Sequence, residues 1–167
     1  MKIFNNPTIS KKYKGSAIAI GNFDGVHKGH QKVFKQAKKF AKENKIRFGV
    51  LTFTPLPVMF FNKKVINYKL ISEDHKFKIF KKYGVDFLVN TKFNKTFSKI
   101  SAKKFIKNII HKKINPKLIF VSNNFKFGNK RKGNVDLLKR LSKKYGYKLL
   151  IIKPFRDQGK IVSSTRI

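Results

Sequence analysis

Two histidines lie three residues apart in the stretch AIAIGNFDGVHKGHQ, at His27 and His30, where an apolar run gives way to a turn. Backbone without Cβ atoms can approach a ligand closely, and the turn carries three glycines. The unpaired N–H groups at the start of a helix, next to two imidazoles, suit an anionic group such as a phosphate. We therefore predict a phosphate-binding turn, whose glycines are Gly21, Gly25 and Gly29.

The two histidines also admit other interpretations. Histidines at i and i+3 without a third ligand nearby indicate a metal site only weakly, so we predict none. The stretch contains neither the GxxxxGK[ST] pattern of a P-loop nor the GxGxxG pattern of a dinucleotide-binding turn. The alternative without a binding role is that both are ordinary surface histidines at a turn. His75 and His111 lie in lysine-rich helical segments, where we expect them to face solvent.

Short apolar segments alternate with amphipathic segments along the whole chain. We predict strands at Ser16–Gly21, Arg47–Phe53, Asp86–Thr91, Lys117–Ser122 and Lys148–Lys153. We predict helices at His30–Lys45, Ser72–Tyr83, Ser101–Lys113 and Gly133–Tyr145, with Gly146 ending the last one. This order predicts an α/β fold, a doubly wound (Rossmann-like) parallel sheet of about five strands with helices on both faces. Ligands of such sheets bind beyond the carboxyl ends of the strands, where the histidine turn falls.

The chain carries 41 basic residues against 7 acidic ones, a net charge of +34. A basic nucleic-acid-binding module is one reading of this charge. However, all but five of the basic residues are lysine, whereas nucleic-acid interfaces recruit arginine for bidentate contacts. A compositional bias towards Lys, Asn, Ile and Phe explains the charge better, and nucleic acid is not the partner we expect. The charge still attracts anionic ligands.

Cysteine is absent, which excludes disulfides and thiolate metal sites. The first residues, MKIFNNPTIS, lack the apolar core of a signal peptide, and no apolar run is long enough to span a membrane. We therefore expect a cytoplasmic protein with no membrane partner. The length fits one domain, residues 1–167.

The histidine turn resembles the HxGH motif of nucleotidyltransferases. More narrowly, GNFDGVHKGHQ resembles the signature of prokaryotic FAD synthetases, the FMN adenylyltransferase module of bifunctional riboflavin kinase/FAD synthetases. Four further segments resemble that family in the same order. They are LTFTPLPVMFF (Leu51–Phe61), GVDFLVNTKFNKTFSKISAKKFI (Gly84–Ile106), VSNNFKFGNKRKGNVDLL (Val121–Leu138) and VSSTRI (Val162–Ile167).

The sequence departs from the family pattern at four positions. Leu56 stands where the family usually has histidine, and Ser122 replaces a glycine. Asn124 and Asn134 each stand where aspartate is common. An Asp-to-Asn change removes a charge but keeps an acceptor and adds two donors.

The resemblance implies the reaction of ATP with FMN to give FAD and pyrophosphate, with Mg²⁺ accompanying the triphosphate. It implies catalytic roles for His27, His30, Asn124, Ser164 and Arg166. It implies nucleotide or phosphate contacts from the turn that includes Asn22, Phe23, Asp24 and the three glycines, and from Phe125, Ser163 and Thr165. It implies an aromatic flavin slot formed by Phe53, Pro55, Pro57, Phe61, Phe93 and Phe97.

Two more expectations follow from the resemblance. The family continues into a riboflavin kinase domain, which we expect in the full-length protein and which is absent from this chain. The rival hypotheses are another HxGH nucleotidyltransferase acting on a different phosphorylated small molecule, and a flavin-binding protein without turnover.

Overall fold

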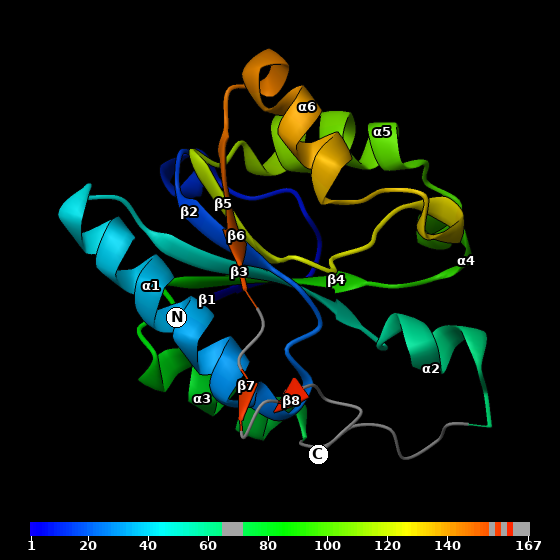
Figure 1. The fold of residues 1–167 in the computed structure, drawn as a ribbon, viewed down its shortest axis with the longest axis horizontal. Helices are drawn as coiled ribbons and strands as arrows, with labels where there is room; N and C mark the ends of the chain where they lie inside the picture. Colours follow the sequence, from blue (N-terminus) through cyan, green and yellow to red (C-terminus); the bar gives the residue numbers. More distant parts are fainter. Residues whose placement is uncertain (65–71, 154–155, 158–159, 162–167) are drawn as a thin grey trace.

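The computed structural model describes residues 1–64 and 72–153, and the backbone of two short strands further on. Its core is one sheet in which every pairing is parallel, with strand order β1-β4-β3-β2-β5-β6 (Figure 1). These strands are β1 (Lys2–Phe4), β2 (Ala17–Ile20), β3 (Phe48–Thr54), β4 (Phe87–Lys92), β5 (Leu118–Ser122) and β6 (Lys148–Ile152). A separate antiparallel pair is formed by β7 (Arg156–Asp157) and β8 (Lys160–Ile161).

Helices cover both faces of the sheet. In Figure 1, α5 and α6 lie on one side of the sheet, and α1 and α3 lie on the other. The α-helices are α1 (Lys28–Glu43), α2 (Pro57–Phe61), α3 (Glu73–Lys82), α4 (Lys95–Ser98), α5 (Ala102–Lys104) and α6 (Val135–Tyr145). The 3₁₀ turns are η1 (Lys11–Tyr13), η2 (Asp24–Val26) and η4 (Asn129–Arg131), and η3 (Phe105–Ile114) is a π-helix that continues α5.

The predicted fold class is confirmed, and each predicted strand and helix occurs within a few residues of its expected bounds. The sheet has six strands because the three-residue β1 adds an edge, and so short a strand leaves no periodic signal. The helix predicted from Ser101 is mostly π-helical. The solvent-facing position expected for His111 is wrong: the ring packs on Tyr145 with centroids 5.0 Å apart, and its Nδ1 is buried.

Polar side chains set where three of the helices begin. The Ser72 and Ser101 hydroxyls accept hydrogen bonds from the N–H groups of His75 and Lys104, as expected of N-caps. Asn134 caps α6 in the same way, since its Oδ1 accepts from the Leu137 N–H at 2.9 Å. Asparagine and aspartate are equivalent caps, so the departure at Asn134 keeps this function.

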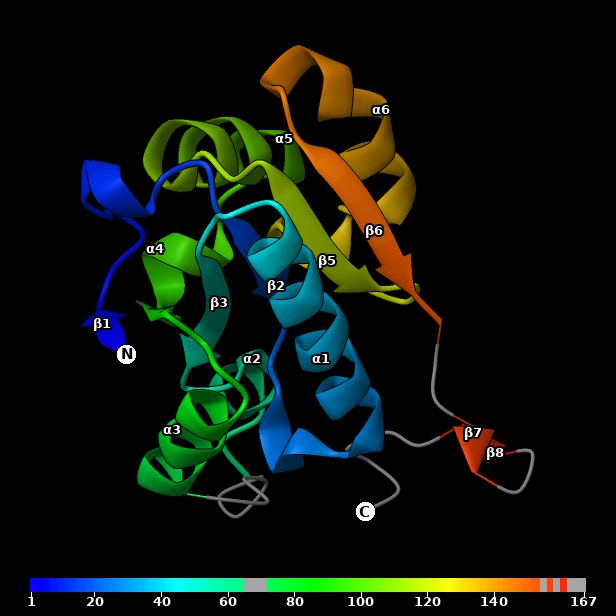
Figure 2. The ribbon, with the colours of Figure 1, turned by 90° about the vertical axis from the view of Figure 1, so that its left-hand side faces the viewer.

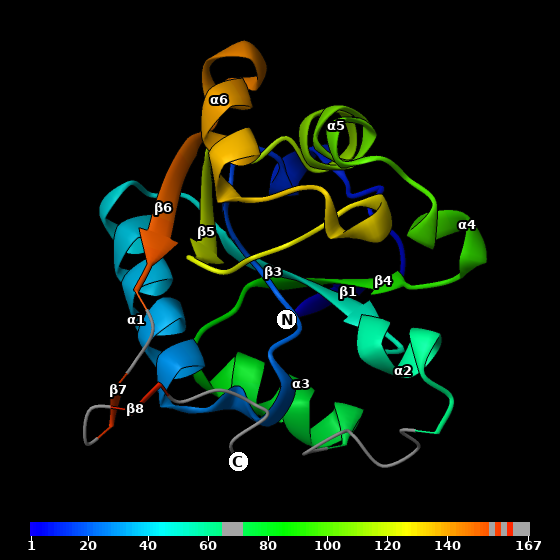
Figure 3. The same ribbon diagram turned by 45° about the vertical axis from the view of Figure 1, so that its right-hand side comes forward.

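The position of β2 at the centre of the sheet locates the ligand crevice. From β2 the chain runs through α1 to β3 on one side, whereas β5, on the other side of β2, is reached through α5 and η3 on the opposite face. The order therefore reverses between β2 and β5. Figure 2 shows that α1 starts below the end of β2, and Figure 3 shows that α2 and α4 lie beyond the ends of β3 and β4. Ligands of open α/β sheets bind at such a reversal.

Large aromatic rings fill the space between the sheet and its helices. Phe34, Phe48 and Phe80 are fully buried on the α1 and α3 side, and Phe87 and Phe105 on the other. Gly49 in β3 makes room for one of them, because a Cβ atom built there would overlap the Phe87 ring. The ring is fully buried and has little freedom to withdraw.

We predict that Gly49→Ala lowers the free energy of unfolding by about 1–3 kcal/mol through overpacking. Urea denaturation of Gly49→Ala, Phe87→Leu and the double variant measures this. Because the smaller leucine vacates the space that the new methyl group needs, the double variant should lose less stability than the sum of the single changes. Additive losses would contradict the proposed contact.

Candidate active site

A cavity of about 600 Å³ opens at the crevice, between the segments that follow β2, β3, β4 and β5. Most of the site residues predicted from the sequence line this one cavity although they are far apart in the chain. Those residues are Gly21, Asn22, Phe23, His27, Gly29, His30, Phe53, Pro57, Phe61, Phe93, Phe97, Asn124 and Phe125.

Three other predicted site residues, Asp24, Gly25 and Pro55, do not line the cavity. The Asp24 side chain is buried, and Gly25 adopts a φ of +73° within the η2 turn, so both belong to the structure of the turn. Pro55 follows a cis peptide bond and does not contribute to the lining. Four predicted residues fall outside the described residues, namely Ser163, Ser164, Thr165 and Arg166.

The two imidazole rings form a stacked pair at the N-terminus of α1. The ring centroids of His27 and His30 are 3.7 Å apart with an interplanar angle of 25°. His27 is the N-cap residue, and its Nδ1 accepts a hydrogen bond from the Gly29 N–H at 3.2 Å. The neutral ring therefore carries its proton on Nε2, where it can donate to a ligand. The edge of the Phe23 ring supports His30 at a centroid distance of 5.1 Å.

Both histidines are neutral at physiological pH. Burial lowers the pKa of His27, and it lowers the pKa of His30 to about 3, with smaller contributions from the charges of His27 and Lys76. The Nδ1 atom of His30 is buried and has no hydrogen-bond partner among the described residues. Each neutral ring can donate one hydrogen bond while carrying no charge of its own. A bound anion would offset the positive charge near His30 that disfavours protonation of that ring.

Asn124 presents its amide in the loop after β5. The Ser122 hydroxyl donates a hydrogen bond to the Asn124 Oδ1 at 2.8 Å, which leaves the NH₂ group directed elsewhere. Both departures from the family pattern in this loop thus act together, because the serine orients the asparagine. An exposed amide oriented in this way offers two donors to an anionic group in the cavity.

Aromatic rings in contact with one another form a continuous wall of the cavity. Phe93 contacts Phe53, Phe61 and Phe97 with centroid distances of 6.2, 5.8 and 5.5 Å. Phe61 is 69% exposed, so its apolar surface is available to a ligand. A second set of rings extends the wall through Phe97–Phe105, Phe105–Phe127 and Phe125–Phe127 contacts. A wall of this size suits a flat heteroaromatic ring.

The sequence analysis missed several cavity residues. Examples are Ser98, Ile100, Lys130 and Arg131, which lie in the segments after β4 and β5 that resemble the family but were not singled out there as ligand contacts. Lys76 was also missed. It lies beneath the histidine turn on α3, and a lysine within an otherwise apolar helix face was the available signal.

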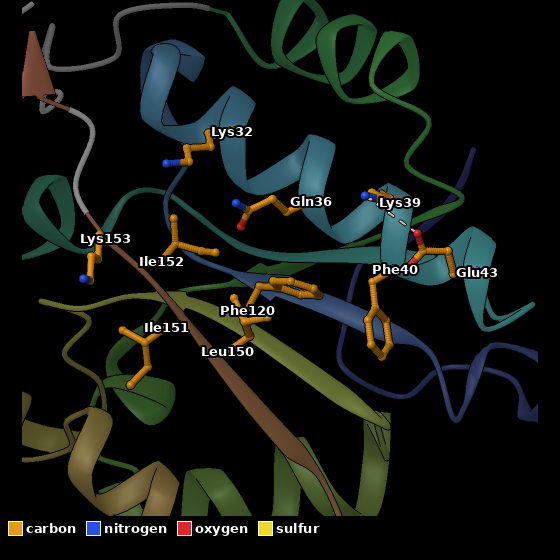
Figure 4. Close-up of a pocket in the computed structure, with 10 residues that line it drawn as sticks. All are labelled: Lys32, Gln36, Lys39, Phe40, Glu43, Phe120, Leu150, Ile151, Ile152 and Lys153. Carbon is orange, nitrogen blue, oxygen red and sulfur yellow. Dashed lines mark ion pairs between the residues drawn. The ribbon is translucent and has the colours of Figure 1, made fainter.

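A second hollow lies between α1 and the exposed edge of β6 (Figure 4). Its carboxylate, Glu43, is already paired with Lys39 at 3.9 Å. Leu150 and Ile151 supply an aliphatic floor without groups that could transfer a proton or a phosphoryl group. The second hollow therefore lacks the imidazole pair that lines the first cavity.

Two kinds of feature are absent from the described residues. No three His, Cys, Asp or Glu side chains gather there as metal ligands. None of the helices in that part of the chain is long and apolar enough to cross a membrane.

The depressed pKa of His30 predicts that stability falls in mild acid. Between pH 6.5 and 3, His30 is protonated in the unfolded chain but remains neutral in the folded chain. The free energy of unfolding therefore decreases as the pH falls through that range. Urea denaturation at pH 7, 5.5 and 4.5 should show a smaller decrease for His30→Gln. His75→Gln, on an exposed position, is the matched control and should keep the wild-type decrease. Equal pH dependence in all three proteins would contradict the assignment.

The chain is similar to proteins of known family over most of its length. A bifunctional riboflavin kinase/FMN adenylyltransferase of Buchnera aphidicola (from Schizaphis graminum) is 41% identical over 160 residues, which cover 95% of this chain and 51% of that protein. The chain spans about half the length of the curated relatives it matches. A crystal structure from Streptococcus pneumoniae described as a macrolide-efflux protein has a TM-score of 0.80 and 26% identity, covering 98% of this chain and 53% of that one.

The fold is shared more widely. A pantoate-beta-alanine ligase of Francisella tularensis has a TM-score of 0.64 at 17% identity and covers 99% of this chain and 72% of its own. The family model for FAD synthetase matches residues 9–166, which is nearly the whole chain. On these grounds, the chain belongs to the FAD synthetase family.

Proposed function

We propose that this chain is an FMN adenylyltransferase, which transfers AMP from ATP to FMN and releases pyrophosphate. One observation carries the proposal: the stacked His27–His30 pair and the aromatic wall around Phe93 face the same cavity. The first suits phosphates and the second suits an isoalloxazine ring, and the reaction joins the phosphate of a flavin nucleotide to a triphosphate. Family membership supports the same activity.

The chemistry needs no covalent enzyme intermediate. A phosphate oxygen of FMN attacks the α-phosphorus of ATP, a new P–O bond forms, and the bond from that phosphorus to the bridging oxygen breaks. The bridging oxygen leaves on pyrophosphate, and negative charge shifts between oxygens that the site must hold in line. Catalysis of this kind consists mainly of positioning and charge stabilisation.

The neutral histidines suit that task. The Nε2–H of His27 can donate to a phosphate oxygen, because its Nδ1 is occupied by the Gly29 N–H. Both rings stand at the N-terminus of the 16-residue α1, where unpaired N–H groups and the helix dipole favour negative charge. A phosphate bound there would raise the pKa of both rings and strengthen their hydrogen bonds.

The remaining site residues complete the proposal. The Asn124 amide is placed to donate to a phosphate, with Ser122 holding its oxygen. Ser163, Ser164, Thr165 and Arg166 are proposed as further triphosphate ligands, on the strength of the sequence motif alone. Mg²⁺ would enter with ATP, since phosphate oxygens are its preferred ligands and it keeps several waters.

The relatives named as bifunctional also carry a riboflavin kinase activity. We propose that the kinase resides in the half of those proteins that this chain does not match. The FMN made by a kinase would be the substrate of the present site. ATP is available in the cytoplasm, and we propose that compartment for the reaction.

Chromatography of FMN, ATP and Mg²⁺ incubated with the protein tests the proposed activity. The wild type should form FAD, and His27→Ala/His30→Ala should lose at least about a hundred-fold in rate, because two phosphate donors are removed. His75→Ala should retain wild-type activity. CTP in place of ATP, and phosphopantetheine in place of FMN, test the rival nucleotidyltransferase reading. A product from either pair without FAD would overturn the proposal.

The aromatic wall predicts a selective effect on flavin binding. Phe93→Ala removes a ring at the centre of the wall and should raise the KM for FMN by roughly ten-fold, about 1.4 kcal/mol, while the KM for ATP changes little. Steady-state kinetics at saturating co-substrate separates the two constants. Phe40→Ala removes a ring from α1 next to the second hollow and serves as the control for general destabilisation. An equal rise in both KM values would contradict the flavin slot.

A further inference from the structure

The turn that carries His27 has an unusual backbone. Phe23, Gly25 and Val26 have φ angles of +49°, +73° and +38°, in the region that only glycine adopts readily. A β-branched residue such as Val26 is an outlier there. Residues in such conformations persist only where their surroundings hold them. The segments that hold this turn therefore control where the histidines stand.

The turn is held at both of its ends by hydrogen bonds to backbone carbonyl groups. At its far end, the Gln31 Nε2 donates to the Val26 carbonyl at 3.1 Å. At its near end, the Asn22 carbonyl accepts two hydrogen bonds, from the Lys76 Nζ at 2.6 Å and from the Thr52 Oγ1 at 3.1 Å. The two donors are themselves joined, because Lys76 donates to the Thr52 Oγ1 at 3.1 Å.

Lys76 is unusual among the lysines that the structure describes, because it is buried. Its residue is 7% exposed and Thr52 is fully buried, so the hydrogen bond between these two side chains is shielded from water. The Nζ atom also lies 5.8 Å from the centroid of the Phe80 ring. Burying an ammonium group is costly, and an apolar side chain of the same length would often stabilise the fold equally well. Packing alone therefore does not account for a lysine at this position.

We propose that Lys76 is a positioning residue of the adenylyl-transfer site, which fixes the Asn22 carbonyl and through it the turn that presents His27 and His30. The lysine acts from beneath the turn and does not line the cavity. Its charge acts in the same direction, since it contributes to the lowered pKa of His30 and so helps to keep that ring a neutral donor. The inference rests on the proposed function for its kinetic readout.

Lys76→Met tests the role, because methionine has a similar length and no hydrogen-bonding ammonium group. We expect kcat/KM for FAD formation to fall by at least about ten-fold, since small displacements of catalytic groups have large effects on rate. Lys78→Met is the matched control: it removes the same charge from an exposed position on the same helix, and its activity should stay within about two-fold of wild type. A folded Lys76→Met variant with the activity of Lys78→Met would overturn the proposal.

Two further measurements separate positioning from mere stability. NMR titration should show a higher His30 pKa in Lys76→Met than in the wild type, because a positive charge near the ring is removed. Phe80→Leu, which loosens the packing beside Lys76 and keeps its charge, measures the part of the shift that packing alone produces, and the shift in Lys76→Met should exceed it. Thr52→Val removes the second donor to the Asn22 carbonyl, so it should lower kcat/KM too. If Lys76→Met does not fold, Thr52→Val tests the hydrogen-bond network in its place. Unchanged activity in a folded Thr52→Val would then reject the network. If the wild type forms no FAD, the proposed function fails, and an unshifted His30 pKa in Lys76→Met would reject the positioning role independently.

Discussion

The parallel pairing of β2 between β3 and β5 is the constraint on which the rest of the structure depends. Every strand of this sheet ends at the same edge, so the segments after four different strands converge there. The helix that follows β2 and the helix that precedes β5 lie on opposite faces of the sheet. The cavity opens between the ends of these two strands. Histidines, an asparagine and an aromatic wall meet because of this arrangement, although up to about a hundred residues separate them in the chain.

The site divides its chemistry between two kinds of surface. One surface carries polar donors on a strained turn and on the loop after β5, and basic side chains that include Lys130 and Arg131 also line the cavity. The other surface is a wall of phenylalanine rings, which offer no hydrogen-bonding groups to water. A substrate that is both a phosphate ester and a flat ring satisfies both surfaces at once, whereas a simple phosphate or a simple aromatic compound would satisfy only one.

The charge of the chain acts at longer range than the site. With 41 basic and 7 acidic residues, the surface attracts every anionic ligand, including nucleotides and flavin phosphates. Inside the cavity the histidines nevertheless stay neutral, because burial outweighs any gain from protonation. Attraction is therefore general and comes from the surface, while recognition is local and depends on hydrogen-bond donors held by the fold.

Local patterns in the sequence determined the fold class, most strand and helix positions and the grouping of Gly21, His27 and His30 in one turn. These features depend on residues that are neighbours in the chain, through periodicity, capping and turn chemistry. Only the tertiary structure decided the strand order, the packing of His111 against Tyr145 and the burial of Lys76 under Asn22. Lys76 and Asn22 are 54 residues apart, and no local pattern records which distant carbonyl a lysine will meet once the sheet has assembled.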